Sequence, residues 1–355
     1  MSKLRIGIIG TGGISNCHMA GYKALPDTVE VVAVCDINES KVKTYAEKYG
    51  VSAWYTDFNE MLAKENLDCV SVTTWNSAHM PATVAALNAG VNVICEKPMA
   101  MNAEEAELML DVAKKNRKVL QIGFVRRFGD DALAAKKYID AGVIGDIYYG
   151  KAQYLRRRGC PGGWFGDKAY SGGGPLIDLG VHVMDLVRYL GGCPKPVSAF
   201  GATFNNLTAS RDEDGEKAWV TTTDSKGFKF DVEDFTSTMV RFDNGLVMTV
   251  EASFNLNIKK DYGSSVELFG TKSAVHIDPF EIYTDVDNEY PELRSDEPAR
   301  FDFDKAFNAE IAAFIDSVKN GTPCKAPAED GVALMKIIDA IYKSAETGHE
   351  APIEW

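Results

Sequence analysis

The sequence predicts an α/β protein that begins with a doubly wound parallel sheet and continues into an α+β domain with a large, mostly antiparallel open sheet. Three observations lead to this prediction. Short apolar runs alternate with helical patterns over about the first 120 residues, as in a parallel sheet. A glycine-rich turn joins the first run to the first helical pattern. Beyond residue 145, strand-like runs dominate, and two of them flank Asp243-Asn244-Gly245, a hairpin signal.

Size and composition limit the classes of protein to consider. At 355 residues the chain exceeds what a single core normally supports, and we expect two domains, residues 1–123 and 124–355. The net charge of −13 argues against nucleic-acid binding, which needs clustered Lys and Arg. No apolar stretch approaches the roughly 20 residues that span a bilayer, and the immediate start of a core strand leaves no room for a signal peptide. The seven scattered cysteines form no C-x-x-C pair, so we expect reduced thiols in a cytoplasmic protein and no metal site.

The chain opens with a strand, a glycine turn and a helix. Residues 4–9 form a largely apolar run with three β-branched isoleucines, and the turn that follows leads into a helical pattern up to residue 25. In this context Gly10 permits a tight turn, Gly12 lets the backbone approach a pyrophosphate, and the helix N-terminus attracts the anion. The predicted dinucleotide-binding loop consists of Gly10, Gly12, Gly13 and Ile14. The alternative is an ordinary strand–turn–helix connection without a ligand.

The second predicted strand, residues 30–35, ends at Asp36, about 20 residues beyond the glycine turn. A carboxylate at this position accepts a hydrogen bond from the ribose 2′-hydroxyl of NAD, whereas NADP requires a cation for its 2′-phosphate. The next residues are Ile37 and Asn38. We therefore predict NAD rather than NADP. Alternatively, Asp36 caps the helix predicted over residues 40–49.

The rest of the first domain supplies more residues at the same sheet edge. Strands are predicted over 67–72, 91–95 and 119–123, and helices over 59–64, 81–89 and 102–116. Ligands bind beyond the carboxyl ends of such strands, so the residues there are predicted to face the cofactor: Thr74, Asn76, His79, Glu96 and Lys97. Pro98 restricts the backbone of Lys97, whose ammonium could then donate to a substrate hydroxyl and stabilise a developing alkoxide. Alternatively, Lys97 is a surface residue at a strand end.

In the second domain, a helix predicted over residues 177–190 carries the other candidate catalytic groups. Asp178 and His182 are four residues apart and share one helix face, so the carboxylate could orient the imidazole. An imidazole titrates near pH 6.5 and suits proton removal from an alcohol. The alternative is a buried structural histidine. We also expect helices over 130–141, 304–320 and 328–347, and strands over 145–158, 197–204, 219–223, 232–242, 246–254, 264–269 and 274–277.

Several spaced motifs together resemble the glucose–fructose oxidoreductase and inositol dehydrogenase (Gfo/Idh/MocA) family. They are the segments 74–79, Glu96-Lys97-Pro98, 123–128, 139–147, and the glycine-rich run from Gly172 to Asp185 that contains Asp178 and His182. The resemblance covers the whole chain. It implies a catalytic Lys97, helices over 304–347 that pack back across the molecule, and an oligomer interface on the open sheet face near Met239, Val247, Thr249 and Glu251.

The resemblance also indicates the reaction. It implies an NAD-dependent dehydrogenase that oxidises a secondary alcohol of a pyranose sugar or glycoside, at C3, and forms a homodimer or homotetramer. The predicted substrate residues are Arg127, Tyr154, Arg156, Arg158 and Trp164, since aromatic rings beside hydrogen-bonding groups suit a sugar. Two alternatives remain open: an inositol 2-dehydrogenase, and a non-catalytic regulator that senses NAD on the same fold.

Overall fold

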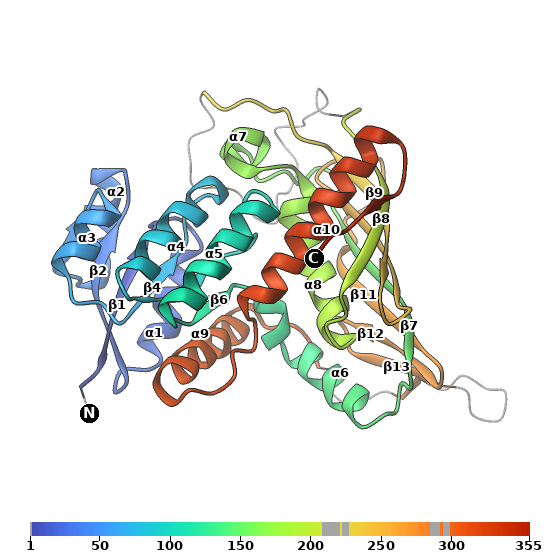
Figure 1. Ribbon diagram of the computed structural model, residues 1–355, viewed down its shortest axis with the longest axis horizontal. Helices are drawn as coiled ribbons and strands as arrows, with labels where there is room; N and C mark the ends of the chain where they lie inside the picture. Colours follow the sequence, from blue (N-terminus) through green and yellow to red (C-terminus); the bar gives the residue numbers. More distant parts are fainter. Residues whose placement is uncertain (1, 208–220, 222–226, 285–291, 294–298) are drawn as a thin grey trace. The chain divides into compact units, whose positions relative to one another are not determined.

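The computed structural model describes residues 2–207, 221, 227–284, 292–293 and 299–355 (Figure 1). The chain forms two compact units. The first contains Met1–Val125 and Asp304–Val332, and the second contains Arg126–Phe303 and Ala333–Trp355. The strand expected over residues 219–223 lies outside the described part of the chain, apart from residue 221.

The first unit is built on a six-stranded sheet in the order β3-β2-β1-β4-β5-β6, and every neighbouring pair is parallel. This strand order is that of a dinucleotide-binding doubly wound sheet, and it confirms the predicted fold class. The strands are β1 (Leu4–Ile9), β2 (Val29–Cys35), β3 (Ala53–Tyr55), β4 (Cys69–Val72), β5 (Asn92–Cys95) and β6 (Leu120–Ile122). The helices between them are α1 (Ser15–Lys23), α2 (Glu39–Tyr49), α3 (Phe58–Lys64), η1 (Asn76–Ala78), α4 (His79–Asn88) and α5 (Ala103–Asn116).

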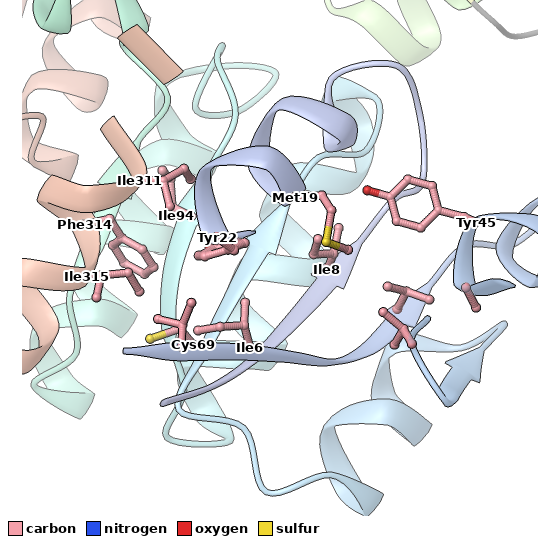
Figure 2. Close-up of a cluster of buried hydrophobic side chains, with 14 of the residues drawn as sticks. Ile6, Ile8, Met19, Tyr22, Tyr45, Cys69, Ile94, Ile311, Phe314 and Ile315 are labelled. Carbon is pink, nitrogen blue, oxygen red and sulfur yellow. The ribbon is translucent and has the colours of Figure 1, made fainter. Parts of the chain in front are cut away.

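A helix from late in the sequence completes the core of this unit. Figure 2 shows side chains of β1, α1 and α9 (Phe303–Asn320) turned toward one another. Tyr22 of α1 and Phe314 of α9 are both fully buried there. Burial of each such ring contributes roughly 1.5–3 kcal/mol. Helix α9 is therefore an integral part of the nucleotide-binding unit.

Side-chain caps set where two of these helices begin. Asn102 caps α5 because its Oδ1 accepts the Glu105 N–H at 2.9 Å, a bond that satisfies one of the exposed donors of the first turn. Asn38 caps α2 in the same way, through the Lys41 N–H at 3.0 Å. The alternative in which Asp36 caps this helix is therefore wrong.

The second unit is built on a nine-stranded sheet in the order β14-β13-β12-β11-β7-β10-β9-β8-β15. The central pair, β7 and β10, is parallel, and the other pairs are antiparallel, which confirms a mostly antiparallel sheet. The strands are β7 (Ile147–Leu155), β8 (Pro196–Phe204), β9 (Phe235–Phe242), β10 (Val247–Ser253), β11 (Gly263–Gly270), β12 (Ser273–Ile277), β13 (Glu281–Thr284), β14 (Glu292–Leu293) and β15 (Ala351–Pro352).

Helices cover one face of this sheet. They include α8 (Val181–Leu190), which packs on the central strands, and α10 (Ala328–Thr347), whose Ser344 accepts the Gly201 N–H of β8 at 3.0 Å. The remaining helical segments are η2 (Val125–Phe128), α6 (Asp130–Asp140), η3 (Gly163–Gly166), α7 (Lys168–Ser171) and η4 (Leu176–Gly180). Within the described ranges, none of the helices is both long and apolar enough to cross a bilayer.

The helix predicted over residues 177–190 differs from the expectation at its beginning. Its first turn, η4, is a π-helix that continues directly into α8. A π-turn adds one residue to the turn, and such turns are frequent at functional sites. Asp178 lies in the π-turn and His182 in the first turn of α8. Their relative orientation is therefore not that of an ordinary α-helical i, i+4 pair.

Candidate active site

The glycine turn is fixed between the ends of two strands. Gly10 has a φ of +94°, and a Cβ on it would lie 2.6 Å from the Thr73 carbonyl oxygen. Its N–H donates to the Cys35 carbonyl at 2.8 Å, and its carbonyl accepts the Thr73 hydroxyl at 2.6 Å. By contrast, the atom nearest to a Cβ on Gly12 would be the Thr73 oxygen, 3.9 Å away. Gly10 is thus required by the turn itself, while the space around Gly12 is open to a ligand.

The Asp36 carboxylate is tied to this turn. One of its oxygens accepts both the N–H and the hydroxyl of Thr11, each at 2.9 Å, and the other accepts the Asn38 N–H at 3.0 Å. Lys41 Nζ lies 3.9 Å from the carboxylate. The acid is therefore held at the end of β2, where a ribose hydroxyl is expected. Sequence reasoning overlooked Thr11, because it occupies the variable position of the glycine motif.

Glu96 is buried beneath the strand end and bonded to a histidine from α1. Its Oε1 lies 3.0 Å from His18 Nε2, and its Oε2 accepts the Lys97 N–H at 3.2 Å. His18 Nδ1 is 2.9 Å from the hydroxyl of Ser71, which is also 2.7 Å from the Tyr22 hydroxyl. Burial acts to raise the pKa of Glu96, but the hydrogen bond and charge of His18, together with Lys97, outweigh it and lower the pKa. The Glu96 side chain therefore supports the backbone of Lys97, and His18 is a supporting residue to which the sequence motifs did not point.

His79 links the two strand ends that carry the other predicted residues. Its Nδ1 lies 2.7 Å from the Pro98 carbonyl oxygen and its Nε2 lies 3.2 Å from that of Thr74. Burial lowers the pKa of His79 and so favours the uncharged ring. An uncharged ring can donate to only one of these two carbonyl oxygens, of which that of Pro98 is the nearer. Asn76 is buried at the start of η1. Lys97 is half-buried.

These residues fit NAD. The open approach at Gly12, the N-terminus of α1 beyond it and the anchored Asp36 correspond to the pyrophosphate and ribose contacts of a dinucleotide. In the parts of the chain that the structure describes, no group of three or more His, Cys, Asp and Glu side chains is arranged to hold a metal ion.

The second unit holds the predicted acid–base pair. Asp178 is buried, with 8% of its surface exposed, and His182 is half-buried. The Asp178 N–H donates to the Gly174 carbonyl at 3.1 Å. One turn beyond His182, Asp185 forms a buried ion pair with both Arg127 Nε (2.8 Å) and Arg127 Nη2 (2.5 Å). Such a bidentate pair holds α8 against the η2 segment. In this geometry Arg127, which was predicted to bind substrate, stabilises the position of α8.

Of the other predicted substrate residues, Tyr154, Arg156 and Arg158 lie at or just beyond the end of β7, and Trp164 lies in η3. Arg156 donates to the Tyr154 hydroxyl at 3.4 Å and to the Gly159 carbonyl at 2.9 Å. Arg158 donates to Asn257 at 2.8 Å. The Trp164 ring stacks on Phe165 with a centroid distance of 3.8 Å. Tyr154 and Arg156 are thus brought together, whereas Arg158 and Trp164 contact other neighbours.

The parallel sheet, the glycine turn and the anchored Asp36 define a protein of the dinucleotide-binding Rossmann class. Residues 4–124 match the family model described as "Oxidoreductase family, NAD-binding Rossmann fold", and residues 132–276 match the "GFO/IDH/MocA C-terminal domain". The chain belongs to the Gfo/Idh/MocA family. NAD is its cofactor, as the sequence predicted.

Three similar proteins cover essentially the full chain. D-glucoside 3-dehydrogenase of Escherichia coli (strain K12) is 36% identical over 348 residues, which are 98% of this chain and 97% of that protein. Myo-inositol 2-dehydrogenase of Thermotoga maritima is 27% identical over 99% of both chains. A solved structure of levoglucosan dehydrogenase in complex with NADH and levoglucosan is 26% identical, with a TM-score of 0.84 over all of both chains.

Proposed function

We propose that this oxidoreductase oxidises a secondary hydroxyl of a pyranose glycoside, at C3, to give a 3-keto sugar. The observation that carries the substrate class is the full-length similarity to D-glucoside 3-dehydrogenase. The Tyr154–Arg156 cluster supports it, because a phenol ring and a guanidinium group offer stacking and donors to a sugar.

The proposed chemistry assigns one step to each of three side chains. When bound, NAD supplies the hydride acceptor. Lys97 donates a hydrogen bond to the substrate hydroxyl and stabilises negative charge on its oxygen as the hydride departs. His182 accepts the hydroxyl proton, and Asp178 orients its ring. The remaining predicted contacts follow the same assignment: Gly10, Gly12, Gly13 and Ile14 with the pyrophosphate, Asp36 with the adenosine ribose, and Thr74, Asn76, His79 and Glu96 around the nicotinamide end.

A cyclitol is the second candidate substrate. An inositol presents a ring of hydroxyl groups much like that of a hexopyranoside, and the T. maritima relative named for this reaction aligns with 99% of this chain. In this case the roles of Lys97, Asp178 and His182 stay the same.

The test is a screen of NAD reduction by the purified protein. We expect methyl β-D-glucopyranoside to be oxidised with a higher kcat/KM than myo-inositol, with a 3-keto product identified by NMR.

Lys97→Ala should lower kcat at least about 100-fold and leave the Kd for NAD within a few-fold of wild type. Lys115→Ala, at an exposed lysine of α5, is the matched control and should retain wild-type turnover. Wild-type kcat in Lys97→Ala would refute the mechanism, and NAD binding without turnover of any sugar or cyclitol would support the sensing regulator.

Two further features complete the proposal. We infer that the protein is a homo-oligomer that associates through the open face of the nine-stranded sheet, where Phe200 and Met239 are 54% and 47% exposed. We also infer that it works in the cytoplasm, since it uses NAD and its seven cysteines are free thiols. Fractionation of cells that express a tagged chain tests the location.

A further inference from the structure

A buried acid from outside the predicted site lies at the start of the helix that carries Asp178 and His182. Glu233 precedes β9 and is 9% exposed. Its Oε2 accepts the Gly174 N–H at 3.0 Å, and its Oε1 accepts the Leu176 N–H at 3.2 Å. The Tyr342 hydroxyl of α10 donates to the same Oε1 at 3.0 Å. Three donors thus converge on one carboxylate at the first residues of η4.

The glycine run before this helix is shaped around the same two side chains. A Cβ on Gly173 would lie 2.0 Å from the Tyr342 hydroxyl oxygen. A Cβ on Gly174 would lie 2.4 Å from the Glu233 carbonyl oxygen. Any larger residue would displace either the tyrosine or the backbone of Glu233. The closeness of these contacts explains why the chain has glycine at both positions.

Electrostatics support a fixed arrangement at this point. The segments η4 and α8 are continuous, and the N-terminal end of a helix carries partial positive charge that stabilises a nearby carboxylate. Burial raises the pKa of Glu233, while the hydrogen bonds from Gly174, Leu176 and Tyr342 act to lower it. Burial together with the charge of Glu233 raises the pKa of Tyr342 well above its ordinary value. Tyr342 therefore remains a protonated donor at neutral pH.

The π-turn provides the link to catalysis. The Asp178 N–H donates to the carbonyl of Gly174, whose own N–H is held by Glu233. A shift of the backbone at Gly174 is thereby transmitted to Asp178 and, one turn further along, to His182. Because misplacement of a catalytic group by about 1 Å can cost roughly 100-fold in rate, this anchor acts directly on the proton-transfer geometry.

We propose that Glu233 and Tyr342 are positioning residues, which fix the π-turn so that Asp178 and His182 are held in register for proton transfer. The inference rests on the proposed function, in which His182 accepts the hydroxyl proton. Neither residue contacts the reacting atoms in this assignment. Their effect is on kcat and not on cofactor binding.

The experiment uses the full-length protein with two substitutions of different severity. Tyr342→Phe removes one hydroxyl, and Glu233→Gln keeps one acceptor oxygen but places an amide donor against the remaining N–H or O–H groups. We expect kcat with methyl β-D-glucopyranoside to fall about tenfold in Tyr342→Phe and further in Glu233→Gln, with the Kd for NAD within twofold of wild type. The matched controls are Tyr283→Phe, which removes the donor of a tyrosine–glutamate hydrogen bond of 2.6 Å on β13, and Glu281→Gln, which replaces its acceptor carboxylate by an amide. Both should keep wild-type kcat.

A spectroscopic readout separates positioning from a loss of stability. The chain has five histidines, so the ring Cε1–H signals can be resolved by NMR, with that of His182 assigned from its absence in His182→Asn. We expect Tyr342→Phe to move the His182 signal and leave those of His18 and His79 unchanged. If both anchor variants keep the wild-type kcat and His182 signal while His182→Asn abolishes turnover, the positioning role is refuted and the proposed function stands. If the wild type oxidises no glycoside or cyclitol, the proposed function fails, and the NMR signal still decides whether the anchor positions His182.

Discussion

At the scale of single residues, buried polar pairs underlie the predicted reactive groups. His18, Ser71 and Tyr22 form a connected set of hydrogen bonds that ends on Glu96, directly before Lys97. All four side chains are buried, and a buried polar group without a partner costs about 1–3 kcal/mol or more if charged. The network therefore stabilises the strand end while it defines the direction of the backbone at Lys97.

Replacing His18 tests this network through the pH dependence of stability. In the wild type the folded pKa of Glu96 is lowered, so Glu96 contributes stability above the ordinary carboxyl pKa, and this is lost as the pH falls through the folded pKa. In His18→Ala, burial dominates and raises that pKa, so ionisation of Glu96 opposes folding. We expect the unfolding free energy of the variant to be about 2–4 kcal/mol lower than that of the wild type at pH 7. The difference should become smaller as the pH approaches 4. Urea titration at each pH measures both free energies.

The background variant Glu96→Gln serves as the control for this prediction. Without the carboxyl group, the cost of His18→Ala should be smaller and should no longer increase between pH 4 and pH 6. An equal cost at every pH in both backgrounds would show that His18 acts only through packing.

At the scale of elements, the two glycines of the turn have different roles: Gly10 is needed for folding and Gly12 for cofactor binding. Gly10→Ala places a Cβ against the Thr73 carbonyl at a positive φ, and should cost at least about 3 kcal/mol in unfolding free energy.

Gly12→Ala, by contrast, has room for its methyl group in the turn. It should keep the wild-type Tm but weaken the Kd for NAD at least about tenfold, because the methyl group occupies the approach to the pyrophosphate. Thermal unfolding and a fluorescence titration with NADH measure the two effects, and a Gly12→Ala variant with wild-type Kd would contradict the assigned role.

The same comparison shows which elements can be predicted from sequence. Strand β1 and helix α10 have the expected bounds, and α5 with its cap Asn102 spans the helix predicted over residues 102–116, since each depends on signals within a few residues. The π-turn at Asp178 was not predictable, because it is anchored by Glu233, which is 59 and 57 residues away in sequence from its partners Gly174 and Leu176. The supporting role of His18 was not predicted for the same reason, because its partner Glu96 is 78 residues further along the chain. Thr11 occupies a variable position of the glycine motif, and its partner Asp36 is 25 residues further along.

At the scale of the whole molecule, each unit contributes a different part of the proposed reaction. The first unit has the features of a cofactor site and carries Lys97, while the second carries Asp178, His182 and the open sheet. Helix α9 belongs to the first unit and most of α10 to the second. Because α10 also supplies Tyr342, the end of the sequence helps to stabilise both the core of the cofactor unit and the start of the catalytic helix.

The open sheet face leads to the prediction at this scale. Phe200 of β8 and Met239 of β9 are directly paired in register and about half exposed, and nearby Phe204 stacks on Phe235 at 5.6 Å. Exposed apolar side chains gathered on one face of a sheet are typical of an interface between subunits. The double variant Phe200→Glu/Met239→Glu would place two carboxylates from each copy into that interface, at a cost of several kcal/mol per buried ion. We therefore expect light scattering coupled to size-exclusion chromatography to show an oligomer for the wild type and a monomer for the double variant.

The control is Leu108→Glu on α5, at an equally exposed apolar position (46%), which should leave the mass unchanged. A monomeric wild type at about 10 μM, well above the Kd of a stable oligomer, would contradict the proposed interface.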